Sequence, residues 1–141
     1  MSSPPQQKQP QPRRSPSDHQ YRLRIDTTGE RGIVALVDHR QRTIAARAFS
    51  IDPSSPGVLL RAIDALRRAR RLHLDSFRGI EVVPGPGRFS RVRLGVVTAN
   101  VLAWALGAPL VVRGNRVRIA TPEYGAEPHI GGVDNDRRGR D

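Results

Sequence analysis

Residues 84–107, PGPGRFSRVRLGVVTANVLAWALG, decide the fold of this 141-residue chain because they join a turn to a long apolar segment. Glycine and proline lie at both ends of the segment, so the pattern predicts a helix over 91–106. Short apolar runs flank it at 79–83 and 110–112. A helix that crosses between two neighbouring strands makes them parallel, so these residues predict a strand–helix–strand unit.

The residues before this unit predict a three-stranded antiparallel meander and an amphipathic helix. Apolar and charged residues alternate at 21–26, and two further strand-like segments follow at 33–37 and 43–49 after short polar turns. From residue 57 to 71, apolar positions three and four apart are separated by arginines, which is typical of a helix with one buried face. The order βββαβαβ is that of the ribonuclease H-like fold. It predicts an α/β protein with a mixed five-stranded sheet, a single lobe of the actin-like and sugar-kinase ATPase fold.

Composition indicates one domain with irregular ends. Residues 1–20 are rich in proline, glutamine and serine, which predicts a disordered tail. Residues 122–141 are rich in glycine and charge and are expected to be mostly irregular, which leaves 21–121 as the domain. The chain has no cysteine, which excludes a disulfide framework, a thiolate metal site and a cysteine nucleophile. The longest apolar stretch is too interrupted for a membrane span, so a cytoplasmic protein is expected.

The positive charge lies in the predicted domain. The chain has a formal net charge of +11, and residues 21–121 hold 18 arginines against 7 acids. Such a charge favours a polyanionic partner, although a GC-rich genome also enriches arginine without selection for binding. A single-strand binder also needs exposed aromatic residues among the basic ones. The six aromatic residues form no cluster in the sequence, which is an argument against that class.

The helix predicted at 91–106 is apolar around most of its circumference, interrupted chiefly by Arg93, Thr98 and Asn100. A helix in so small a domain can bury one face on the sheet and part of another on a neighbouring helix. The remaining apolar surface is then exposed, and such surfaces usually mark an interface. Gly95 and Ala99 are small and four residues apart, which permits close approach of another helix.

Two turns are candidates for phosphate binding. Asp26, Thr27 and Thr28 follow the first predicted strand, where actin-like ATPases hold magnesium and phosphate. A small ATPase or nuclease built on Asp26 is therefore one hypothesis. The second turn, around Gly85 and Gly87, contains two prolines that lack amide donors, and a structural turn is favoured there. The four histidines are scattered and form no metal-ligand or triad pattern, so no metal, cofactor or catalytic residue is expected.

Several segments resemble the TsaB family, the dimerisation subunit of the bacterial machinery that makes threonylcarbamoyladenosine in tRNA. Residues 81–99, EVVPGPGRFSRVRLGVVTA, resemble the family signature GPGSFTGLRIGVATAKGLA. Further matches follow the family order: IDTT at 25–28, SPGVLLRAI at 55–63, GAPLV at 107–111 and PEYGAEPHI at 122–130. The departures are Ser55 for a histidine, Arg61 for a proline and RFSR at 88–91 for SFTG. The second lobe of the usual member is missing, so the chain resembles a one-lobed, minimal member.

The resemblance implies a catalytically silent scaffold that pairs with a TsaD-like transferase, or with a second copy of itself, through its two helices. The implied interface residues are Leu59, Ile63, Leu66, Gly95, Val97, Val101 and Trp104. Gly85, Gly87, Phe89 and Arg93 are expected to brace the loop, and Asp26, Thr27 and Thr28 to form a vestigial phosphate loop. The alternative is an arginine-rich module that binds tRNA or other RNA and shares only the fold. The two roles combine if the basic face contacts tRNA held mainly by the transferase.

Overall fold

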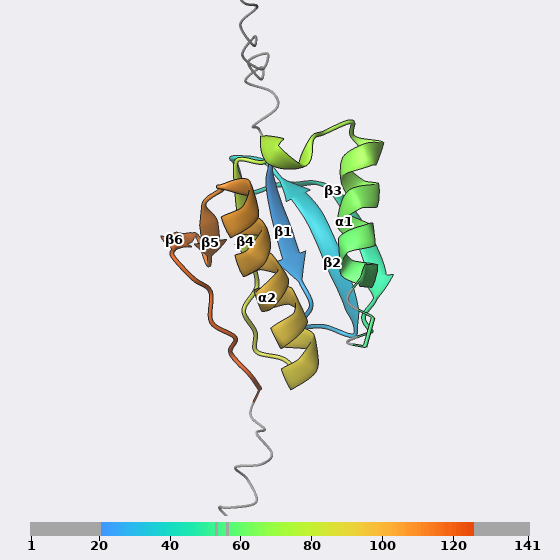
Figure 1. Cartoon of the computed structure of the whole chain (residues 1–141), viewed down its shortest axis with the longest axis vertical. Helices are drawn as coiled ribbons and strands as arrows, with labels where there is room; N and C mark the ends of the chain where they lie inside the picture. The colour runs from blue at the N-terminus through green and yellow to red at the C-terminus, as the bar shows by residue number, and fades with distance from the viewer. Residues whose placement is uncertain (1–20, 53, 56, 126–141) are drawn as a thin grey trace, which may run out of the picture.

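The computed structural model describes residues 21–52, 54–55 and 57–125 (Figure 1). The predicted tail at 1–20 lies outside the described residues, and of the segment 122–141, predicted to be mostly irregular, only 122–125 are described.

The described strands form one mixed sheet in the order β3-β2-β1-β4-β5-β6 (Figure 1). Their bounds are β1 Arg22–Asp26, β2 Arg31–Val37, β3 Thr43–Ser50, β4 Gly79–Val82, β5 Leu110–Val112 and β6 Asn115–Val117. The first three strands pair as the predicted antiparallel meander, β4 lies parallel to β1, and β5 lies parallel to β4. The five predicted strands are therefore present, and β6 is a sixth that the prediction missed.

β6 exists because the chain reverses sharply after β5. Arg113 and Gly114 both have positive φ, of 49° and 82°, and connect β5 to β6 as an antiparallel pair. Two consecutive residues with positive φ match the right-handed twist of a tight hairpin. The three residues of β6 are mostly polar and exposed, so their sequence carries no hydrophobic alternation that could have revealed a strand.

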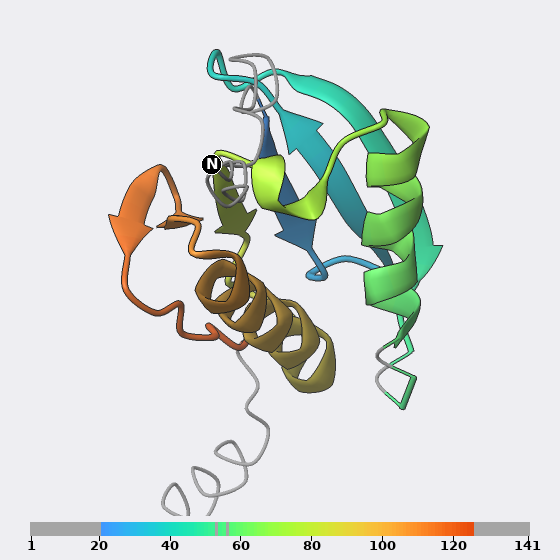
Figure 2. The same ribbon diagram turned by 45° about the horizontal axis from the view of Figure 1, so that its top comes forward.

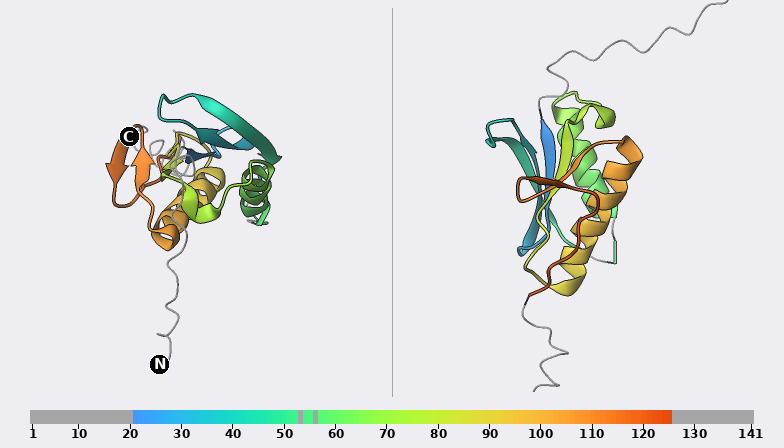
Figure 3. Two further views of the ribbon diagram at one scale, coloured as in Figure 1. Left: turned by 90° about the horizontal axis from the view of Figure 1, so that it is seen from above. Right: turned by 90° about the vertical axis from the view of Figure 1, so that its left-hand side faces the viewer.

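Helices α1 (Gly57–Ala69) and α2 (Phe89–Leu106) lie on the same face of the sheet (Figures 2 and 3). α1 packs on β2 and β3, and α2 packs on β4, β1 and β5. A short 3-10 helix, η2 (Leu74–Ser76), follows α1. α2 ends as predicted at Gly107, which adopts φ 64° and donates its N–H to the carbonyls of Ala103 and Trp104. A residue at this position needs the left-handed conformation that glycine adopts without strain.

The core lies between this helical layer and the sheet. Strand alternation turns Leu23 and Ile25 of β1 towards the helices, and both are completely buried. Val92 and Val96 of α2 meet the sheet from the other side and are equally buried. Each such side chain contributes about 1.5–3 kcal/mol on burial. The intervening residues of β1 point to the opposite face of the sheet.

That opposite face carries an ion-pair group at its centre. Arg22 Nη1 lies 3.1 Å from Glu81 Oε1, and Arg24 Nε lies 3.1 Å from Glu81 Oε2. The parallel register of β1 and β4 places Arg24 directly beside Glu81, so the pairing follows from the strand order. Seen edge-on, both helices stand on one side of the sheet (Figure 3, right).

Candidate functional site

The predicted exposed apolar surface lies on α2. Val97, Val101 and Trp104 are 49%, 55% and 84% exposed. They are four and three residues apart, so they share one side of the helix and form a continuous row, here called the α2 stripe. Another side of α2 is buried on the sheet. The helix therefore has two apolar sides, one that packs in the core and one that forms the stripe.

Three of the residues implied as interface residues are core residues instead. Leu59, Ile63 and Leu66 of α1 are between 0% and 4% exposed and belong to the central apolar cluster. This corrects the expectation that they face a partner. An amphipathic helix turns its apolar side towards its own sheet, and the large apolar residue that α1 leaves exposed is Leu60.

Gly95 allows a close approach, but within the domain. A Cβ atom at Gly95 would overlap Thr27 Oγ1, in the turn that follows β1. The Thr27 hydroxyl donates a 2.6 Å hydrogen bond to the Arg91 carbonyl on α2. Gly95 therefore fits α2 against the β1–β2 turn, and it does not face outward as an interface residue.

The predicted vestigial phosphate loop, at Asp26, Thr27 and Thr28, is a turn held by hydrogen bonds within itself. Asp26 Oδ1 accepts hydrogen bonds from the backbone N–H and the hydroxyl of Thr28, at 2.9 and 2.6 Å. These bonds use that carboxylate oxygen to hold the turn. Across 21–52, 54–55 and 57–125, no three histidine, aspartate or glutamate side chains gather in a way that could hold a metal ion.

The loop at 84–87 holds another segment of the chain. Gly85 has φ 137°, and a Cβ there would overlap the carbonyl of Glu123. The Glu123 N–H donates to the Pro84 carbonyl at 2.7 Å, and the Gly125 N–H donates to the Gly87 carbonyl at 3.0 Å. Gly87 also packs closely on Val92: a Cβ atom at position 87 would lie only 2.8 Å from Val92 Cγ2. These contacts dock the segment after residue 121 against the 84–87 loop, just before α2.

Docking brings together two aromatic residues that are far apart in the sequence. The Phe89 and Tyr124 rings lie 4.7 Å apart between centroids, tilted by 35°. The guanidinium carbon of Arg93 lies 5.8 Å from the centre of the Phe89 ring. Phe89 is 56% exposed, Tyr124 is 41% exposed and Arg93 is exposed, so all three side chains lie at the surface, and bracing of the loop by Phe89 and Arg93 stays a prediction. Sequence reasoning found no aromatic cluster because this one depends on the docked segment.

Glu123, next to this ring pair, has its own partner. Both of its carboxylate oxygens accept hydrogen bonds of 2.7 Å from the Arg113 guanidinium. This pairing holds the pKa of Glu123 below its usual value and raises the pKa of Arg113. The two opposite charges offset each other at the base of the segment that carries Tyr124.

No helix among the described residues has the length and apolar character needed to cross a membrane. No family model matches the chain, and the curated proteins contain no match.

Two solved structures from Pseudomonas aeruginosa share the fold. The first is YeaZ, also called TsaB, with 27% identity and a TM-score of 0.58 over 67% of this chain and 44% of that one. The second is described as an uncharacterized protein with similarity to peptidase YEAZ. It has the same identity, TM-score and coverage of this chain, and 43% of its own length is covered. The chain thus spans less than half the length of either structure, and its fold is TsaB-like, an α/β lobe of the actin-like class.

Proposed function

We propose that this chain is a non-catalytic scaffold and dimerisation subunit that supports a TsaD-like transferase in tRNA threonylcarbamoyladenosine modification, in the cytoplasm. The α2 stripe is the observation that carries the proposal, and the likeness to YeaZ supports it. Asp26, the carboxylate of the vestigial phosphate loop, is already engaged within its own turn. We assign no catalytic residue.

The stripe has the character of a binding anchor. A few well-packed side chains near the centre of an interface supply most of its affinity, and tryptophan is among the residue types enriched there. Trp104 is the most exposed large apolar residue of the described chain, and Val101 lies beside it on the next turn of the helix. Burying such a row against the apolar face of a partner helix contributes about 25 cal/mol per Å² removed from water. The same stripe serves a homodimer when the transferase is absent.

Co-purification with the transferase from the same organism tests this proposal. Val101→Arg places a charge in the middle of the stripe and is expected to weaken the complex at least tenfold. The matched control is Ile44→Arg on β3, which replaces an exposed apolar residue at the far edge of the sheet. The control is expected to bind as the unmutated chain does. Failure of the unmutated chain to form any complex, or equal loss in both variants, contradicts the proposal.

A further inference from the structure

The N-terminal end of α2 carries a surface that the scaffold role does not use. Phe89 and Tyr124 stack there, and Arg93 lies over the Phe89 ring. Two more arginines belong to the same helical end, Arg88 beside Phe89 in the sequence and Arg91 towards the β1–β2 turn. We call these five residues the basic aromatic patch. We propose that it binds unpaired nucleotides of a single-stranded nucleic acid, with the rings stacking on bases and the arginines contacting phosphates.

The ring pair is suited to stacking. Phe89 is 56% exposed and Tyr124 is 41% exposed, so part of each ring faces solvent although the two rings touch. Aromatic side chains on a protein surface stack on bases of any sequence, and each such contact is worth about 1–3 kcal/mol. The hydrogen bonds from the Glu123 and Gly125 backbones to the 84–87 loop hold Tyr124 in place before a ligand arrives.

The charges around the rings favour phosphate. Arg88 and Arg93 are exposed, and Arg91 is oriented by a 3.0 Å hydrogen bond from its guanidinium to the Gly29 carbonyl. None of the three forms an ion pair with any described residue. α2 has no acidic residue in its first turn, so its free amides and positive dipole end add to the same field.

Nearby acids reduce this field only partly. Glu123 is bound to Arg113 through both oxygens, and Asp26 is engaged by Thr28. Glu30 is exposed in the β1–β2 turn and is the acid that remains beside Gly29, the residue to which Arg91 donates. Two exposed arginines, Arg88 and Arg93, and the helix end still leave the patch positive.

The chemistry favours single strands over duplexes and over acidic proteins. Bases in a duplex are stacked on each other and cannot stack on a protein ring without being extruded. An acidic protein surface would use the arginines but not the exposed ring pair. The patch adjoins the α2 stripe, because Arg93 lies four residues, or about 6 Å along the helix, before Val97. Val101 and Trp104 are 12 and 15 residues beyond Phe89, which is about 18 and 22 Å, so the centre of the stripe lies away from the rings.

Fluorescence anisotropy with labelled oligo-rU, oligo-dT and a duplex of equal length tests the proposal on the full chain. Both single strands are expected to bind more tightly than the duplex. The tighter binder of the two shows whether the patch prefers RNA or DNA. Two or three phosphate contacts predict a loss of affinity of about tenfold between 50 and 200 mM salt. A preference for the duplex, or an affinity that does not change with salt, overturns the proposal.

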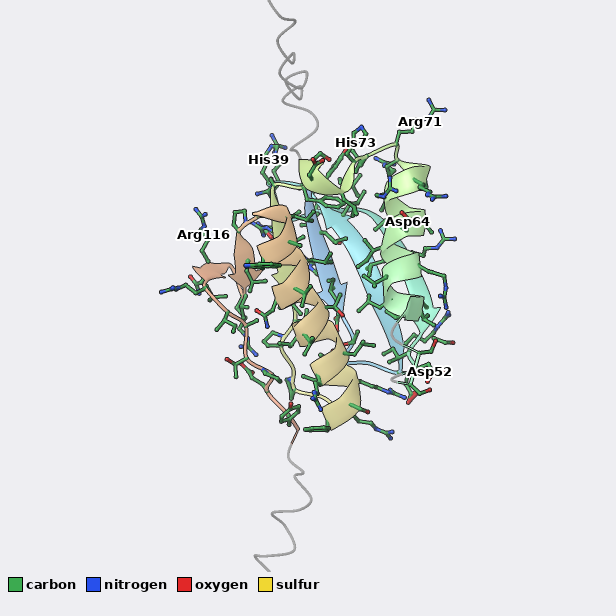
Figure 4. All side chains as sticks on the ribbon, in the orientation of Figure 1. His39, Asp52, Asp64, Arg71, His73 and Arg116 are labelled. Carbon is green, nitrogen blue, oxygen red and sulfur yellow. The ribbon has the colours of Figure 1, made fainter. Side chains whose placement is uncertain are left out.

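Paired variants separate the patch from the general charge of the chain. Tyr124→Ala and Arg93→Ala are expected to weaken single-strand binding at least fivefold, whereas Tyr124→Phe keeps the ring and the affinity. The charge controls are Arg71→Ala, just after α1, and Arg116→Ala on β6, both distant from the lower end of α2 (Figure 4). Equal losses in Arg93→Ala and in these controls contradict a local site. Val101→Arg is expected to keep oligonucleotide binding, so failure of the scaffold proposal and failure of this one are distinguishable.

Discussion

At the scale of single residues, the contact between Gly95 and Thr27 decides how α2 sits on the domain. The glycine leaves room for a hydroxyl that is almost completely buried and that donates to the Arg91 carbonyl. A larger residue at 95 must displace either that hydroxyl or the helix. The small residue therefore serves packing inside the domain.

Gly95→Ala is expected to destabilise the protein although alanine is the better helix former by about 1 kcal/mol. The added methyl group overlaps Thr27 Oγ1, and overpacking of this kind costs about 1–3 kcal/mol. Removing the hydroxyl with Thr27→Ala costs about 1 kcal/mol for the lost hydrogen bond. Urea unfolding of the two single variants and the double variant measures their coupling. The double variant is expected to lose less stability than the sum, and strict additivity contradicts direct contact.

At the scale of elements, the two helices differ in how many faces they can bury. α1 has one apolar face, which is buried, and one charged face. On the charged face, Asp64 forms ion pairs with Arg67 and Arg68, at 2.7 and 3.0 Å. α2 carries apolar residues both on the buried face and along the stripe. The polar side of α1 forms ion pairs, whereas the second apolar side of α2, the row Val97, Val101 and Trp104, stays 49–84% exposed. This difference makes α2 the binding element of the proposal.

Leu59 and Leu60 are neighbours on α1 that test the placement of this helix. Leu59→Ala is expected to cost about 2–5 kcal/mol because it opens a cavity in the core. Leu60→Ala is expected to cost less than about 1 kcal/mol because half of that side chain is already in water. Chemical unfolding of both variants measures the difference. Equal costs would mean that α1 presents a different face to the sheet.

At the scale of the whole molecule, the segment between β6 and residue 125 closes the structure along α2. Asn100 anchors it, because its amide donates to the Ala120 carbonyl at 3.0 Å and its oxygen accepts from the Ala120 N–H at 2.8 Å. The far end of the segment is held by the 84–87 loop. This path runs from the β6 edge of the sheet down beside α2 and brings Tyr124 to Phe89 (Figure 1).

Asn100→Ala is expected to lower stability by about 1–3 kcal/mol, since it leaves both buried backbone groups of Ala120 without their side-chain partner. It is also expected to weaken oligonucleotide binding, because Tyr124 loses part of its support. Asn115→Ala on β6 is the matched control: that side chain is exposed, its hydrogen bond to the Arg113 carbonyl is long at 3.5 Å, and little change is expected. Unfolding midpoints and anisotropy measure both effects. Full single-strand affinity in Asn100→Ala would separate the segment from the patch.

The accuracy of the sequence predictions depended on how local each feature is. Strands β1 to β5 and both helices were predicted within a few residues because hydrophobic period, glycine and proline act over short distances. β6 was missed because three polar residues become a strand only when β5 is beside them. Leu59, Ile63 and Leu66 were assigned to an interface because the resemblance indicated the right helix and could not indicate which of its faces the sheet would cover.

The amino-acid sequence alone determined the order of elements, the class of fold and the excess of apolar surface on α2. The tertiary structure alone decided that this excess is the row Val97, Val101 and Trp104, and that Phe89 meets Tyr124. The physical reason is that periodicity is a property of neighbouring residues. Exposure and ring stacking depend on which distant segments come to lie against each other.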